Sequence, residues 1–172
     1  MRETRIKTKK LAEFGCLIAF AMIASYVEFL LPIPIGIPGA KLGLANVAIV
    51  YSLERIGPKG AIVINVSRIL LCGLLFGNVY SLLYSLVGGI FSLGIMVILH
   101  KTKIFSIVGV SIAGGVAHNL GQLLLAIIIT EVPVLLYYVP FLLVAGALTG
   151  LFNGWLARIA LQRTSYIKEE LG

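Results

Sequence analysis

The chain has 172 residues, of which 59% are hydrophobic and only 12% are charged, and its formal net charge is +7. Soluble domains carry about 25% charged residues, so a water-soluble chain of this length could not bury so much apolar surface. The basic residues lie at the ends of apolar segments, which indicates membrane topology and argues against nucleic-acid binding. We therefore predict one all-α domain over residues 1–172, spanning the cell membrane several times.

Apolar segments predict a bundle of six transmembrane helices. The first follows a basic start that has no clear signal-peptide cleavage site. After it, the Pro- and Gly-rich stretch 32–41 cannot be helix throughout, and we interpret it as an outer loop and a candidate lid. The next run is short for a full crossing, a polar turn is expected over 54–60, and the tail 162–172 is polar. The expected spans are 11–31, 42–53, 61–76, 79–99, 104–130 and 134–161.

The distribution of Lys and Arg predicts the orientation of this bundle. With six spans, twelve of the fourteen basic residues fall on one side, Lys41 alone falls on the other, and Arg68 remains within the membrane. Cytoplasmic loops are enriched in Lys and Arg. Both termini are therefore expected on the cytoplasmic side.

Small residues recur at four-residue intervals in several spans, a spacing that lets helices approach closely in lipid. The interpretation we favour is packing within the bundle. Docking onto a coupling membrane subunit, or a homodimer interface, is the alternative. The stripes are Gly146, Gly150 and Gly154; Ser81, Ser85 and Gly89; Ala113, Ala117 and Gly121; and the shorter pair Gly15 and Ala19.

Polar residues inside the predicted spans are the candidate functional positions, because a charge at the helix centre costs roughly 2.5–3.5 kcal/mol or more. One interpretation is that they satisfy one another, for example Glu28 with Arg68. The other is that they line an outward-facing pocket for a polar or anionic solute, with Arg68 as its deepest cation. Asn65 lies three residues before Arg68, and Gln122 lies four after His118, so each pair shares a helix face.

Catalytic and metal-binding motifs are missing from the sequence. All seven acidic residues are Glu, and there is no Walker A motif, no metal-spaced His/Cys cluster and no Gly-x-Ser-x-Gly elbow. We predict no catalytic residue, no metal site and no cofactor of its own.

Two segments, PGAKLGLAN (38–46) and GGVAHNLGQ (114–122), resemble the Gx transporter family over roughly residues 8–165. Members are often labelled component I of heptaprenyl diphosphate synthase. The family is similar to the substrate-binding S components of energy-coupling-factor transporters, six-helix proteins whose first loop covers an outward-facing pocket. Some relatives are implicated in flavin transport. In S components a small-residue stripe on the first helix docks the coupling subunit; Gly15 and Ala19 are the nearest match here.

The resemblance implies a transporter, or its substrate-binding subunit, for a small solute, with a flavin nucleotide (FAD or FMN) as the best candidate ligand. Arg68 and Lys41 would contact its phosphates. The alternative is a non-catalytic membrane subunit of heptaprenyl diphosphate synthase, since prenyl synthases use Asp-rich motifs that this chain lacks. The predicted solute-binding residues are Glu28, Lys41, Asn46, Asn65, Arg68, Tyr84, His118, Asn119 and Gln122.

Overall fold

The computed structural model describes residues 2–30 and 43–170, and every regular element within them is helical. The candidate lid 32–41 lies outside these residues. In chain order the elements are α1 (Arg2–Leu30), α2 (Asn46–Arg55), α3 (Pro58–Leu75), α4 (Val79–Thr102), α5 (Ile107–Thr130), the 3-10 helix η1 (Pro133–Tyr138) and α6 (Val139–Glu170). The predicted all-α class is confirmed for the described residues.

The helix boundaries follow local sequence signals. Asn78 precedes α4 and accepts a hydrogen bond from the N–H of Ser81 at 2.7 Å, as an N-cap residue does. α3 begins at Pro58, where a missing N–H is tolerated. The expected polar turn at 54–60 is therefore shorter in the structure, because α2 and α3 both extend into it. α6 also continues beyond 161 and through most of the polar tail.

Five helices are long and apolar enough to cross a membrane, judged by length and composition over the described residues. α2 has only ten residues, which is about 15 Å of helix against a hydrocarbon core of about 30 Å. The span expected at 42–53 is therefore not a full transmembrane helix in the described residues. Large apolar side chains such as Leu74 and Ile104 are 78% and 80% exposed, as expected for a multi-pass membrane protein with a lipid-facing surface.

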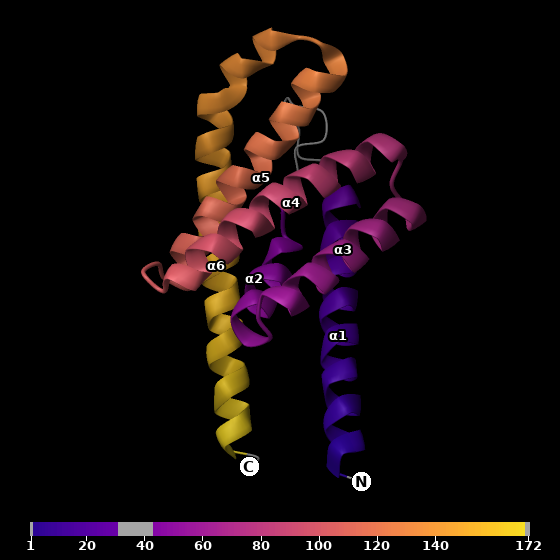
Figure 1. Cartoon of the computed structure of the whole chain (residues 1–172), viewed down its shortest axis with the longest axis vertical. Coiled ribbons are helices and arrows are strands. Elements are labelled where there is room, and N and C mark those ends of the chain that lie inside the picture. Colours follow the sequence, from indigo (N-terminus) through magenta and orange to yellow (C-terminus); the bar gives the residue numbers. More distant parts are fainter. Residues whose placement is uncertain (1, 31–42, 171–172) are drawn as a thin grey trace.

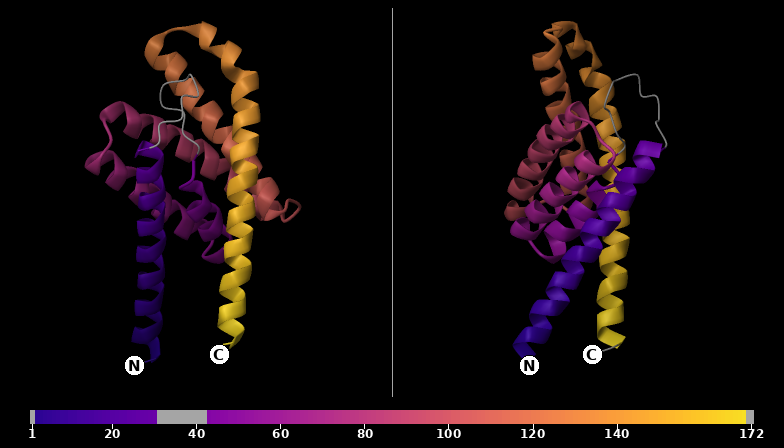
Figure 2. Two further views of the ribbon diagram at one scale, coloured as in Figure 1. Left: turned by 180° about the vertical axis from the view of Figure 1, so that it is seen from behind. Right: turned by 90° about the vertical axis from the view of Figure 1, so that its right-hand side faces the viewer.

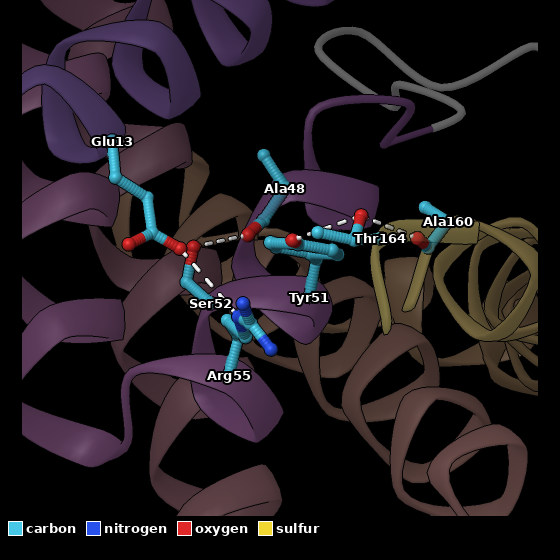
Figure 3. Close-up of polar contacts among 7 residues, drawn as sticks. All are labelled: Glu13, Ala48, Tyr51, Ser52, Arg55, Ala160 and Thr164. Atoms are coloured by element: carbon cyan, nitrogen blue, oxygen red, sulfur yellow. Dashed lines mark hydrogen bonds and ion pairs between the residues drawn. The ribbon is translucent and has the colours of Figure 1, made fainter. Parts of the chain in front are cut away.

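α2 is enclosed by other helices. Ile49 and Leu53 are each 1% exposed and belong to a core cluster that includes Ile64 of α3 and Met96 of α4. Polar contacts tie α2 to the two terminal helices (Figure 3). Arg55 Nε lies 3.7 Å from Glu13 Oε1 of α1, and the Tyr51 hydroxyl donates to Thr164 Oγ1 of α6 at 3.3 Å. These contacts fix the short helix inside the bundle.

Glycines bring α5 and α6 into backbone contact. A Cβ on Gly146 would lie 2.8 Å from the Gly115 carbonyl oxygen, and one on Gly150 would lie 2.6 Å from the Ser111 carbonyl oxygen. Gly154 of the same stripe faces Ser111 as well. The stripe of the sixth predicted span therefore packs within the bundle, as we favoured.

Successive helices run in alternate directions, and the two termini lie at the same end of the long axis (Figure 1). α1 and α6 project beyond the other helices at that end (Figure 2). The α2–α3 and α4–α5 turns lie nearer this end than the α3–α4 and α5–α6 turns do.

Candidate functional site

Arg68 lies at the junction of α1, α3 and α4 and is only 8% exposed. Its Nη1 donates to Ser25 Oγ of α1 at 3.2 Å, and its Nη2 donates to Asn65 Oδ1 at 3.0 Å, as the three-residue spacing predicts. The buried Nε has no hydrogen-bond partner among the described residues. Glu28 is close enough to interact electrostatically with the guanidinium. A buried cation with a spare donor can bind an anion.

A narrow pocket opens beside Arg68. It measures about 30 Å³, which is roughly the space of one water molecule. The hydroxyls of Ser81 and Ser85 come from α4. Aromatic rings form another side, where Phe76 stacks edge-on against Tyr26 with ring centroids 5.3 Å apart. The pocket thus combines one cation, several hydroxyls and aromatic surface. Its lining residues are Ser25, Phe29, Arg68, Ile69, Cys72, Gly73, Phe76, Gly77, Ser81, Leu82 and Ser85.

Two adjacent glycines on α4 separate polar groups of α3 from polar groups of α5. Asn65 Nδ2 donates to the Gly89 carbonyl oxygen at 3.4 Å, and a Cβ on Gly89 would lie 3.0 Å from that nitrogen. A Cβ on Gly88 would lie 2.9 Å from both His118 Cε1 and Gln122 Cγ. His118 and Gln122 therefore share a face, as predicted, and press against the bare backbone of α4.

Asn119 points to α6, where its Nδ2 donates to the Leu142 carbonyl oxygen at 3.1 Å. This bond joins two transmembrane helices in a buried setting. Asn119 therefore has a structural partner, whereas the buried Nε2 of its neighbour Gln122 has none among the described residues.

Side chains stabilise the backbone where α2 begins. Glu28 Oε1 accepts from the Leu44 N–H at 3.0 Å, and Asn153 Nδ2 of α6 donates to the Gly43 carbonyl oxygen at 3.0 Å. Gly43 has a φ of +73°, and a Cβ there would lie 2.9 Å from Asn46 Nδ2. Inside a membrane every backbone polar group needs a partner, and the end of a short helix leaves several without one. Glu28 supplies one of these partners, to the Leu44 N–H. Asn153 adds a second donor to the Gly43 carbonyl oxygen, which already accepts from the Asn46 N–H at 2.8 Å.

The predicted site residues thus fall into separate groups. Arg68 and Asn65 line one side of α4, and His118 and Gln122 line the other. Glu28 and Asn46 both lie beside the turn that precedes α2. Tyr84 is half-buried on α4 and is not part of the Arg68 pocket. Lys41 lies outside the described residues.

Sequence reasoning missed Asn153. It is 2% exposed and directly precedes Gly154 of the small-residue stripe, so an amide inside an apolar span was the available signal. The adjacent glycines at 88 and 89 were a second signal. Among the described residues, no group of three or more His, Cys, Asp or Glu is placed to hold a metal ion.

The family model described as "Heptaprenyl diphosphate synthase component I" matches residues 17–160 of the chain. This match covers α2 to α5 entirely, about half of α1 and most of α6. No curated protein and no solved structure matches the chain.

Proposed function

This chain belongs to the heptaprenyl diphosphate synthase component I family, and on that premise we propose that it is a membrane transporter, or the substrate-binding subunit of one, for a small anionic solute. The observation that carries the proposal is Arg68, a cation buried among three helices with one N–H group left for a ligand. Glu28 lies close enough to compensate part of this charge, and the remaining Nε N–H is the group that a solute anion would bind.

A flavin nucleotide remains our candidate solute. Its phosphate would pair with Arg68 and with the hydroxyls beside it, and its ring would stack on the aromatic side chains near Phe76. The pocket holds only about one water molecule in this conformation, so the solute enters only when α1 or α4 moves away from α3. We further propose that both termini are cytoplasmic and that α2, although too short for a full crossing, returns the chain toward the cytoplasmic side.

Titration of the full chain in lipid nanodiscs with FAD, FMN and riboflavin tests this proposal. Arg68→Gln should weaken FAD and FMN binding about tenfold or more, because a hydrogen bond to a charged group contributes about 1.5–3 kcal/mol. Riboflavin has no phosphate and should be affected less. Arg158→Gln, the same change at an exposed site on α6, is the matched control. Arg68→Lys keeps the charge and separates a charge effect from a folding defect.

The second candidate function is a non-catalytic membrane subunit of heptaprenyl diphosphate synthase, which the description of the family favours. A chain without Asp cannot supply Asp-rich magnesium motifs, so its role would be to position a partner synthase component or its substrate. If the chain binds no flavin at high micromolar concentration but raises prenyl synthase activity when mixed with that partner, the transporter proposal is wrong and this one replaces it.

A further inference from the structure

A second cavity lies between the C-terminal ends of α2 and α4 and the N-terminal end of α5. Its volume is about 310 Å³, at the lower end of the range of roughly 300–1,000 Å³ found for small-molecule sites. Val50, Leu53 and Val110 form its floor and are 3%, 1% and 3% exposed. The cavity shares no lining residue with the Arg68 pocket.

The mouth of this cavity is polar and carries an uncompensated cation. Glu54 Oε2 lies 3.1 Å from His100 Nε2, so the one carboxylate at the mouth is already engaged by an imidazole. Lys103 follows α4 in the left-handed conformation, with a φ of 57°, and its exposed ammonium has no ion-pair partner among the described residues. Ser106 caps α5 and lines the same mouth.

We propose that this cavity binds an amphipathic phosphate, with the phosphate at Lys103 and Ser106 and the apolar chain against Val50, Leu53 and Val110. The apolar floor accepts a chain, and the basic mouth accepts a negative head group. Basic pockets between transmembrane helices near the membrane surface bind phospholipid head groups by the same combination. An anionic phospholipid of the bilayer and a free alkyl phosphate share this chemistry, and the experiment below separates the two sources.

Native mass spectrometry of the delipidated full chain in nonionic detergent measures the binding directly. The probes are phosphatidylglycerol, phosphatidylcholine, dodecyl phosphate and inorganic phosphate. Lys103→Gln should weaken binding of the chain-bearing anions about fivefold, the contribution expected of one lysine near the membrane surface. Lys101→Gln removes the same charge two residues away without touching the cavity, and it should have little effect.

Selective phosphatidylglycerol binding that Lys103→Gln weakens would identify a bilayer lipid as the ligand. Selective dodecyl phosphate binding without phosphatidylglycerol binding would identify a free phosphate ester. Equal losses in the two lysine variants, or equal binding of phosphatidylcholine, would overturn the proposal, because either result reflects general surface attraction. Val110→Phe fills the apolar floor of the cavity and should abolish binding of the chain-bearing anions while the protein stays monodisperse. If inorganic phosphate competes for the site as strongly as dodecyl phosphate does, the apolar chain contributes nothing and the proposed apolar subsite is wrong.

Discussion

Alanine at position 115 tests how closely α5 and α6 pack. A methyl group on Gly115 would lie 2.3 Å from the carbonyl oxygen of Gly146, about 1.1 Å short of the 3.4 Å at which ordinary contact begins. The obstacle is backbone, so no change of rotamer relieves it. The two helices must separate by about 1 Å, and overpacking of this kind costs about 1–3 kcal/mol. We therefore expect Gly115→Ala to lower the melting temperature of the protein.

The matched control is Gly94→Ala on α4, where a Cβ would meet nothing within 4 Å. Alanine is favoured over glycine in a helix by about 0.5–1 kcal/mol, so this variant should be as stable as the parent or more so. The assay is thermal unfolding of the full chain in nanodiscs, followed by size-exclusion chromatography after heating. Equal melting temperatures for the two variants would refute the backbone contact between α5 and α6.

Three further experiments test other parts of the structure. Gly43→Ala should destabilise the protein by about 1–2 kcal/mol in the same thermal assay, because the left-handed backbone conformation at position 43 disfavours a Cβ. An unchanged melting temperature would contradict this backbone conformation. Asn119→Ala should lower stability by about 0.6 kcal/mol, the average for a hydrogen bond between membrane helices, through loss of the bond to Leu142; an effect no larger than that of an exposed Asn→Ala change would argue against the bond. The third experiment tests orientation in cells that express the chain without its native cysteines. An impermeant maleimide should label Thr130→Cys in intact cells, and it should label Lys101→Cys only after the membrane is permeabilised. The reverse labelling pattern would show that the termini lie outside the cell.

Much of the fold was predictable because lipid imposes simple rules on sequence. Long apolar runs had to be helices, and all five candidate spans begin and end within three residues of the expected boundaries. Composition alone could not show that the short run at 42–53 is surrounded by protein. Hydropathy measures whether a segment avoids water, and it gives the same answer whether protein or lipid surrounds the segment. α2 is apolar because helices enclose it, so its composition resembled that of a span.

The sequence predicted which types of residue form the candidate site, but it predicted less well which of these residues contact one another. Helical spacing correctly placed Asn65 with Arg68 and His118 with Gln122, since neighbours at three or four residues share a face. It could not reveal that Gly88 and Gly89 place these two pairs on different sides of α4. Nor could it show that Glu28 completes the backbone of the turn before α2, because that contact joins residues 16 positions apart.

The two terminal helices are longer than the membrane is thick. α1 has 29 residues and α6 has 32, which correspond to about 44 Å and 48 Å of helix, well beyond a hydrocarbon core of about 30 Å. Both excess lengths project from the same end (Figure 2). The projecting ends therefore lie outside the hydrocarbon core, and each is continuous with the part of its helix inside the bundle. A displacement of the projecting end of α1 would therefore move Ser25, which contacts Arg68. A displacement of the projecting end of α6 would move Asn153, which contacts the turn before α2.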